Sequence, residues 1–176
     1  MPIQRKHATM CLGVLMIATL SWTTSGAAQV GRRTPGEAND AAGTSLSVTA
    51  TVGGGKLSAT GAGRCARETG ASLYDKPAIL YLVEYSGPGE LRGLRLTLWQ
   101  FKDGSPIQLG LTLEVEKGSH QISTLQGGRR EGDATATVQL VGTGGRIVVL
   151  GRDGKRVQIQ ATIECTAFGG IEAEGG

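Results

Sequence analysis

The 176-residue chain contains few aromatic residues, two histidines and three cysteines, and these scarcities limit the chemistry it can carry. A nucleophile elbow of the form G-x-S-x-G is absent. Lys56 and Lys155 each follow a glycine, but neither precedes the serine or threonine of a phosphate-binding P-loop. We therefore expect no cofactor, assign no catalytic residue, and expect a protein that is not an enzyme.

Long apolar runs are also lacking, apart from one between about Met10 and Leu20. That run is about half the roughly 20 residues that a membrane-spanning helix needs. The basic patch Arg5-Lys6-His7 precedes it and small residues up to Ala28 follow it, which is the pattern of a secretory signal peptide over residues 1–28. The mature protein is then expected in the periplasm or the medium, without membrane insertion after cleavage.

The mature chain lacks a charge excess of either sign. The full chain has 18 basic and 15 acidic residues, and removal of residues 1–28 takes away only Arg5 and Lys6, which leaves 16 against 15. A nucleic-acid-binding protein would show a concentrated basic surface. We therefore expect no nucleic-acid partner.

Cleavage also removes Cys11, so that only Cys65 and Cys165 remain. Cys11 stands at the start of the apolar run rather than at its end, which argues against a lipid anchor. Two cysteines in an exported chain predict a Cys65–Cys165 disulfide, with two separate buried thiols as the alternative. No metal site is expected, because two cysteines and His120 cannot complete four ligands without carboxylates.

Alternating polar and apolar residues are the main structural signal, and they are clearest in the stretch Arg156–Cys165. A period of two describes a β-strand with one face in a core and one in water. The same signal predicts strands at 45–52, 56–63, 93–101, 107–116, 120–125, 134–140 and 146–150. Residues 78–85 are apolar on both faces, which predicts a central strand. Gly61 and Gly63 indicate a bulge or the close approach of another backbone.

Turns separate these strands about every eight to twelve residues, and no segment has the period of a helix. The pattern predicts an all-β fold, an antiparallel β-sandwich of about nine short strands, with a small barrel as the alternative. A disulfide between an early strand and the last strand suits a sandwich, because it can join two sheets. The domain is expected at 45–167, between a disordered lead-in at 29–44 and a flexible tail at 168–176, with a connecting loop at 66–77.

The sequences RCARE and IQATIEC, which contain the two cysteines, resemble the small secreted lipoprotein antigens of mycobacteria. Those proteins also bracket a glycine-rich β domain with one early cysteine and one at the end of the last strand. The lipid-anchor cysteine of that group is missing here. The resemblance implies an architecture and no function.

Arg95, Trp99 and Phe101 form the candidate binding surface. Within 93–101 they alternate with Leu94, Leu96 and Leu98, so the two sets occupy opposite faces of the strand. If the leucines face the core, the aromatic residues face outward beside a cation, which is typical of a binding surface. If the strand is covered on both sides, the aromatic residues belong to the core.

The functional interpretation that follows is an exported, non-catalytic module that binds another protein or an envelope component. A second interpretation is a small secreted hydrolase that uses His120 as its base, with Ser119 or Ser123 and Asp133 as the other members of a triad. A lone histidine at a strand start is more often a surface residue. A third interpretation is a structural subunit joined to its neighbours through sheet edges. Arg129-Arg130 is expected to lie in a solvated loop.

Overall fold

The computed structural model describes residues 43–125 and 131–171, and within these ranges it contains ten β-strands and no helix. The all-β class predicted from the sequence is confirmed. The predicted signal peptide, most of the lead-in and the Arg129-Arg130 pair lie outside the described residues. The strands are β1 (Thr44–Val52), β2 (Gly55–Glu68), β3 (Ser72–Leu73), β4 (Lys76–Ser86), β5 (Leu91–Phe101), β6 (Gln108–Val115), β7 (Gly118–Ser123), β8 (Asp133–Val141), β9 (Gly144–Arg152) and β10 (Gln158–Cys165).

Neighbouring strands pair antiparallel in the order β7-β6-β5-β4-β2-β1-β10-β9-β8, and β3 pairs with β4 off this path. The two ends of the path approach each other where Ser123 and Glu131 exchange backbone hydrogen bonds of 2.8 and 3.0 Å. The sheet is therefore nearly closed. The architecture lies between the predicted sandwich and its barrel alternative.

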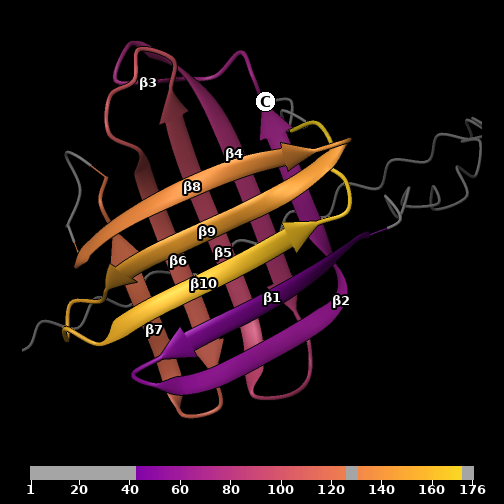
Figure 1. Cartoon of the computed structure of the whole chain (residues 1–176), viewed down its shortest axis with the longest axis vertical. Coiled ribbons are helices and arrows are strands. Elements are labelled where there is room, and N and C mark those ends of the chain that lie inside the picture. Colours follow the sequence, from indigo (N-terminus) through magenta and orange to yellow (C-terminus); the bar gives the residue numbers. More distant parts are fainter. Residues whose placement is uncertain (1–42, 126–130, 172–176) are drawn as a thin grey trace, which may run out of the picture. The chain divides into compact units, whose positions relative to one another are not determined.

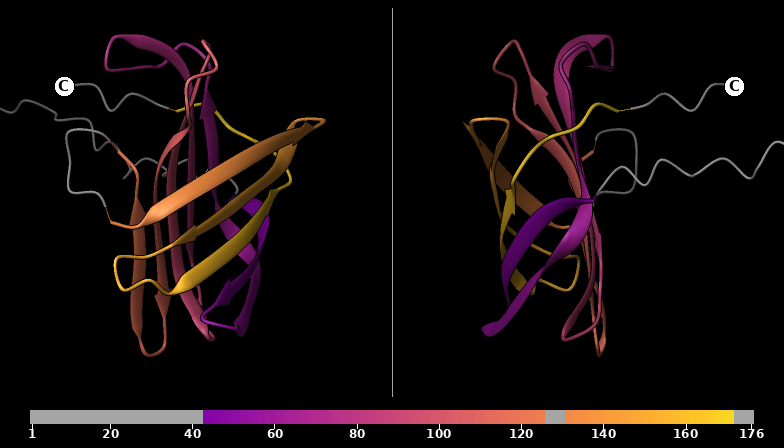
Figure 2. Two further views of the ribbon diagram at one scale, coloured as in Figure 1. Left: turned by 60° about the vertical axis from the view of Figure 1, so that its left-hand side comes forward. Right: turned by 90° about the vertical axis from the view of Figure 1, so that its right-hand side faces the viewer.

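The strands of this sheet form two layers that cross at a steep angle (Figure 1). We call β4, β5, β6 and β7 the rear layer and β1, β8, β9 and β10 the front layer, after their places in Figure 1. Figure 2 shows the two layers facing each other. In orthogonal packing of this kind, the corners are made by strands that pass from one layer to the other.

β2 is the strand that makes such a corner. It pairs with β1 as far as Gly63, which lies opposite Thr44, and from Gly63 onward it pairs with β4, where Tyr85 is the partner. A Cβ atom on Gly63 would lie 2.6 Å from the carbonyl oxygen of Glu84 and closer still to the side chain of Leu46. Glycine is therefore needed where the chain changes layers.

The core lies between the layers and consists mainly of aliphatic side chains from alternate positions. The alternation predicted for β1, β6 and β10 is confirmed by ten inward residues that are at most 5% exposed: Leu46, Val48, Ala50, Leu109, Leu111, Leu113, Ile159, Ala161, Ile163 and Cys165. The terminal inward residues Val52 and Val115 are half-buried. β8 buries less. Its inward residues Ala134, Ala136 and Val138 are half-buried, and Leu140 is 46% exposed.

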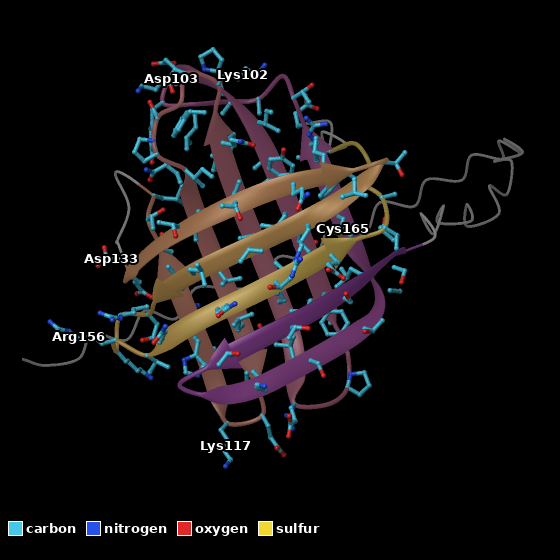
Figure 3. The ribbon with its side chains drawn as sticks, viewed as in Figure 1. Lys102, Asp103, Lys117, Asp133, Arg156 and Cys165 are labelled. Carbon is cyan, nitrogen blue, oxygen red and sulfur yellow. A yellow bond between two sulfur atoms is a disulfide. The ribbon has the colours of Figure 1, made fainter. Side chains whose placement is uncertain are left out.

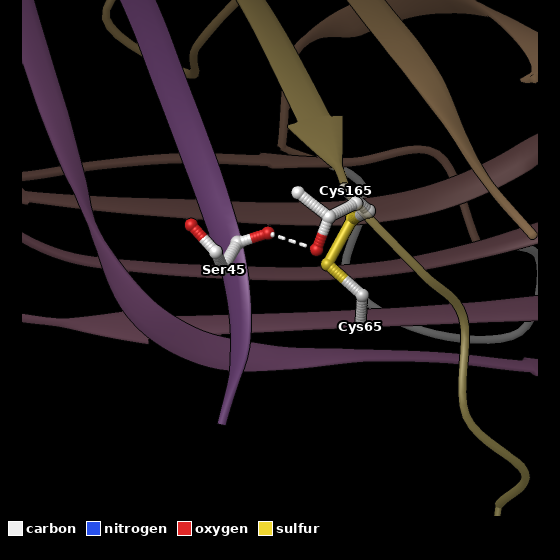
Figure 4. The surroundings of a disulfide bond; sticks show 4 residues. Ser45, Cys65 and Cys165 are labelled. Carbon is white, nitrogen blue, oxygen red and sulfur yellow. Dashed lines mark hydrogen bonds between the residues drawn. A yellow bond between two sulfur atoms is a disulfide. The ribbon is translucent and has the colours of Figure 1, made fainter. Parts of the chain in front are cut away.

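The predicted disulfide is present. Cys65 on β2 is bonded to Cys165 at the end of β10, with the Cα atoms 6.2 Å apart, and both residues are buried (Figure 4). β1 separates β2 from β10 in the sheet order, so the bond joins strands that are not neighbours. Beside it, the backbone and hydroxyl of Thr166 donate to the carbonyl oxygen of Ser45 at 3.1 and 2.9 Å. Closing a loop of 100 residues contributes about 4–5 kcal/mol by the chain-entropy model.

Several strand boundaries differ from the predicted ones, and those of β2 and β10 have a clear structural reason. β2 continues to Glu68 and is followed by the short β3, so much of the loop expected at 66–77 is extended. β10 begins at Gln158 rather than Arg156. The carboxylate of Asp153 accepts hydrogen bonds from the amides of Lys155 and Val157, at 2.9 and 2.8 Å, and these bonds hold the preceding residues in a turn.

The first residues after the last strand also make specific contacts. The Phe168 ring packs edge-on against Tyr81, with the ring centroids 5.6 Å apart. Gly169 donates to the carbonyl of Cys65 and accepts from the amide of Arg67, both at 2.9 Å. The sequence analysis assigns these residues to a flexible tail, of which 172–176 lie outside the described residues.

We predict that Gly63→Ala lowers the stability of the domain by about 1–3 kcal/mol, because the added methyl group overlaps atoms of two neighbouring strands. Thermal unfolding, monitored by circular dichroism, measures this effect. The melting temperature of the variant should fall by several degrees.

Gly61→Ala is the matched control. Its Cβ atom would lie 3.4 Å from the Tyr85 ring, an ordinary van der Waals distance, so the melting temperature should change little. Equal decreases in melting temperature in the two variants would contradict the conclusion that position 63 requires glycine.

Candidate functional site

β5 divides its side chains between the core and the outer surface of the rear layer. Leu94, Leu96 and Leu98 are at most 3% exposed, so the leucine face belongs to the core. Arg95 and Trp99 are on the opposite face, where Arg95 is exposed and Trp99 is half-buried. Trp99 therefore combines a covered part with a part that a partner can reach.

Phe101 differs from its two companions in the candidate surface. It shares their face by alternation, but it is only 7% exposed. The ammonium group of Lys76 lies 5.8 Å from the centroid of its ring. Of the two alternatives in the sequence analysis, the core one holds for Phe101, because β4 begins beside it and Lys76 lies over the ring. Phe101 is therefore not part of an exposed stripe with Arg95 and Trp99.

The strand register identifies further members of the outer face. Leu80 on β4 and Gln108 on β6 lie opposite Trp99 on its two sides, and Leu82 lies opposite Thr97. Leu80 and Leu82 are half-buried. The face therefore has an apolar centre of Leu80, Leu82 and Trp99, which the sequence analysis did not assemble because the register between strands is not visible in the sequence.

Charged residues border this apolar centre. Arg95 Nε lies 3.4 Å from Glu84 Oε1, and the two side chains are 77% and 48% exposed. Glu84 lies directly opposite Arg95 in the β4–β5 pairing. An exposed ion pair of this kind contributes little to folding, typically about 0–1 kcal/mol. Both charges remain available to a partner.

A depression of about 340 Å³ lies beside Phe101, at the end of the rear layer where the β3–β4 hairpin and the β5–β6 loop meet. Figure 3 labels Asp103 in that loop. The lining combines two aromatic rings, one cation and several hydrogen-bonding groups, from Tyr74, Lys76, Phe101, Ser105, Pro106, Gln108 and Thr124. We call it the hairpin depression.

Lys76 is fixed at the rim of the hairpin depression by two contacts. Its ammonium nitrogen lies 3.3 Å from Asp103 Oδ2 and donates to the Ser105 hydroxyl at 3.1 Å. Hydrogen bonds from the hydroxyl and the amide of Ser105, and to a smaller extent Lys76, hold the pKa of Asp103 below its ordinary value. Asp103 is therefore ionised at neutral pH and balances the charge of Lys76.

The turn that carries Tyr74 has an uncommon backbone conformation. Tyr74 and Asp75 connect β3 to β4 with φ angles of 53° and 60°, both in the left-handed region. Hairpin turns of this kind prefer Asn-Gly or Asp-Gly, and a bulky residue there costs on the order of 1–3 kcal/mol. Tyr74 is nevertheless 47% exposed, so burial of its ring does not explain why a tyrosine occupies this position.

Among the residues that line the depression, Gln108 is a buried polar residue with a hydrogen-bonding atom that has no partner. It is 8% exposed, and its Oε1 atom is buried and makes no hydrogen bond. A buried acceptor without a donor costs about 1–3 kcal/mol relative to a paired one. Such a group is an indicator of a ligand or of a functional requirement at its position.

His120 forms the other polar cluster. Its Nδ1 atom lies 2.9 Å from Asp153 Oδ2, and the carboxylate is 4% exposed while the imidazole is 22% exposed. Burial alone would raise the pKa of Asp153, but hydrogen bonds from His120, Val157 and Lys155 outweigh it and hold the pKa below its ordinary value. The pair ties the β9–β10 turn to β7.

The histidine partner differs from the one considered in the sequence analysis. Asp133 stands at the start of β8 (Figure 3). Asp153, between β9 and β10, is the aspartate that contacts His120. Ser119 and Ser123 alternate with His120 along β7, so their side chains are on the opposite face of the strand. The structure therefore brings His120 and an aspartate together and separates both serines from them.

We predict that Asp153→Asn lowers the melting temperature at neutral pH, because the amide removes the charge that faces His120. The folded-state pKa of Asp153 is lowered, so its stabilisation is present above the unfolded value of about 3.9 and is lost as pH falls through the folded value. The difference in melting temperature between the Asp153→Asn variant and the unmodified protein should become smaller below a pH of about 4. A difference that is constant from neutral to acidic pH would contradict this assignment.

No family model, curated protein or solved structure matches the chain. Among residues 43–125 and 131–171, no three His, Cys, Asp or Glu side chains converge in a way that could hold a metal ion. No helix in the same ranges has the length and apolarity needed to cross a membrane. The candidate site is therefore interpreted from its geometry, which centres on the outer face of the rear layer.

Proposed function

We propose that the protein is an exported, non-catalytic module that binds another protein through the outer face of the rear layer. The observation that carries the proposal is the position of Trp99, half-buried between Leu80 and Gln108 on the neighbouring strands. Tryptophan and arginine are the residues that most often dominate binding energy, because they combine large contact area with directional polar groups. Trp99 would be the anchor of the interface.

The surroundings of Trp99 support a protein partner. Protein interfaces have an apolar centre and a polar rim. Leu80, Leu82 and Trp99 supply such a centre, and the exposed Arg95–Glu84 pair supplies a rim with charges of both signs. The complementary surface would carry an apolar patch bordered by one acidic and one basic group.

Export is supported by two independent features. The pattern of residues 1–28 is that of a signal peptide. The Cys65–Cys165 disulfide is compatible with an oxidising compartment, where such bonds form and persist. The periplasm or the medium is the proposed location.

A second candidate function, a structural subunit joined through sheet edges, is supported by β8. β8 ends the strand path, and residues 134–141 carry no charge and no proline. Leu140 and Val141 are 46% and 65% exposed. Strand edges are usually protected by charges, prolines or bulges, and an unprotected one can pair with another chain.

We predict that Trp99→Ala and Arg95→Ala each weaken retention of the partner in a pull-down from native envelope extract. Loss of a hot-spot tryptophan costs about 2 kcal/mol or more, which is about 30-fold in Kd. The melting temperature of each variant is measured in parallel. The melt should change little, because Arg95 is exposed and part of Trp99 is exposed.

Leu150→Ala is the matched control, because Leu150 is a 46% exposed apolar residue on β9 in the front layer. It should retain the partner. If Trp99→Ala costs the roughly 3–5 kcal/mol of an aromatic core truncation, Trp99 is a core residue and the proposed face is wrong. Loss of retention only in a Leu140→Ser, Val141→Ser double variant would favour the structural subunit instead.

A further inference from the structure

We propose that the hairpin depression is a binding site for a single neutral sugar residue, such as an N-acetylated hexose of an envelope glycan. The inference is independent of the protein-binding face, although Gln108 lies opposite Trp99 in the β5–β6 pairing. The volume of about 340 Å³ is at the lower end of the range of about 300–1,000 Å³ that is usual for ligand sites. A ligand of one ring therefore fits better than an extended chain.

Gln108 specifies what the ligand must offer. Its carboxamide oxygen is a buried acceptor that makes no hydrogen bond, and the residue lines the depression. A carboxamide can accept through its oxygen and donate through its nitrogen. A ligand with groups that both donate and accept, such as sugar hydroxyls and an acetamido group, therefore matches it.

The charges at the rim favour a neutral ligand. Lys76 is the cation that lines the depression, and the Asp103 carboxylate lies 3.3 Å from it. An ammonium group has three N–H donors, and the contacts with Asp103 and the Ser105 hydroxyl occupy two of them. The third can donate to a hydroxyl or an acetamido carbonyl of the ligand, whereas an anion would have to compete with Asp103.

Two aromatic rings complete the site. Phe101 and Tyr74 line the depression. The electron-rich face of the exposed Tyr74 ring attracts the C–H groups on the flat side of a sugar, and Phe101, with Lys76 over its ring, adds an apolar wall. The Ser105 hydroxyl already donates to Asp103 and the Thr124 hydroxyl to the carbonyl oxygen of Leu109, so each offers the ligand a remaining acceptor lone pair. Apolar faces with hydroxyls around the edge are the combination that distinguishes a sugar from a purely apolar ligand.

The strained turn is explained by the same site. Tyr74 is held with φ at 53° although asparagine or glycine would suit that position better. Strained residues persist where function requires the side chain that they position. The turn places the Tyr74 ring at the rim of the depression, so we expect stability to improve and binding to be lost when the ring is replaced.

The test uses the protein without residues 1–28. N-acetylglucosamine, glucose and benzoate are each titrated into it, and binding is monitored by the amide chemical shifts in NMR spectra. We expect N-acetylglucosamine at millimolar concentration to shift the amides of Tyr74, Lys76 and Gln108. Benzoate, an aromatic anion without sugar hydroxyls, should not. Shifts with benzoate alone would overturn the sugar assignment, and no shift with any of the three would overturn the site.

Two variants test the roles of the lining residues. Gln108→Leu removes the amide at similar volume and should weaken binding at least tenfold. Tyr74→Asn should weaken binding similarly and raise the melting temperature, because asparagine tolerates the left-handed region. Thr97→Ala, on the same face but outside the depression, is the control and should bind normally.

These outcomes also separate this site from the protein-binding face. If the variants fold and bind the sugar as the unmodified protein does, the hairpin depression is not the site. Partner retention is measured on the same variants and should be unaffected by Tyr74→Asn, because Tyr74 lies outside the protein-binding face. Trp99→Ala should show the opposite pattern, with partner retention lost and sugar binding kept.

Discussion

The passage of β2 from the front layer to the rear layer is the constraint on which the rest of the structure depends. At Gly63 the strand leaves β1 for β4, and the space there admits no side chain. Two residues later, Cys65 is bonded to Cys165, so the end of the last strand is fixed to this corner. The corner therefore connects the two layers and holds the end of β10 at the place where β2 passes between them.

The fixed corner also determines which surface is left for function. The inward faces of both layers pack against each other, so the leucines of β5 are buried and Trp99 is directed away from the core. Because β4 and β5 pair in a defined register, Leu80 and Leu82 lie beside Trp99 and Thr97. At the end of the same two strands, the Tyr74–Asp75 turn and Phe101 enclose the hairpin depression.

The sequence predicts those features that depend on the local alternation of polar and apolar residues or on the oxidising conditions expected for an exported chain. The buried faces of β1, β6 and β10 and the Cys65–Cys165 bond are of this kind. The degree of closure was left open between a sandwich and a small barrel, because the pattern does not show that Ser123 and Glu131, on either side of a stretch without alternation, pair with each other.

Features of the candidate site that arise between strands were equally invisible in the sequence. The Tyr74–Asp75 turn was missed because it contains no glycine, although both residues have positive φ. Alternation placed Phe101 beside Trp99, but a neighbouring strand brings Lys76 over its ring.

The central claim is that the outer face of the rear layer meets the partner. Photo-cross-linking from position 97, compared with the exposed position 160 on β10, tests it most directly in the native envelope. The account predicts a protein adduct from position 97 and none from position 160, and an adduct from position 160 alone would contradict it.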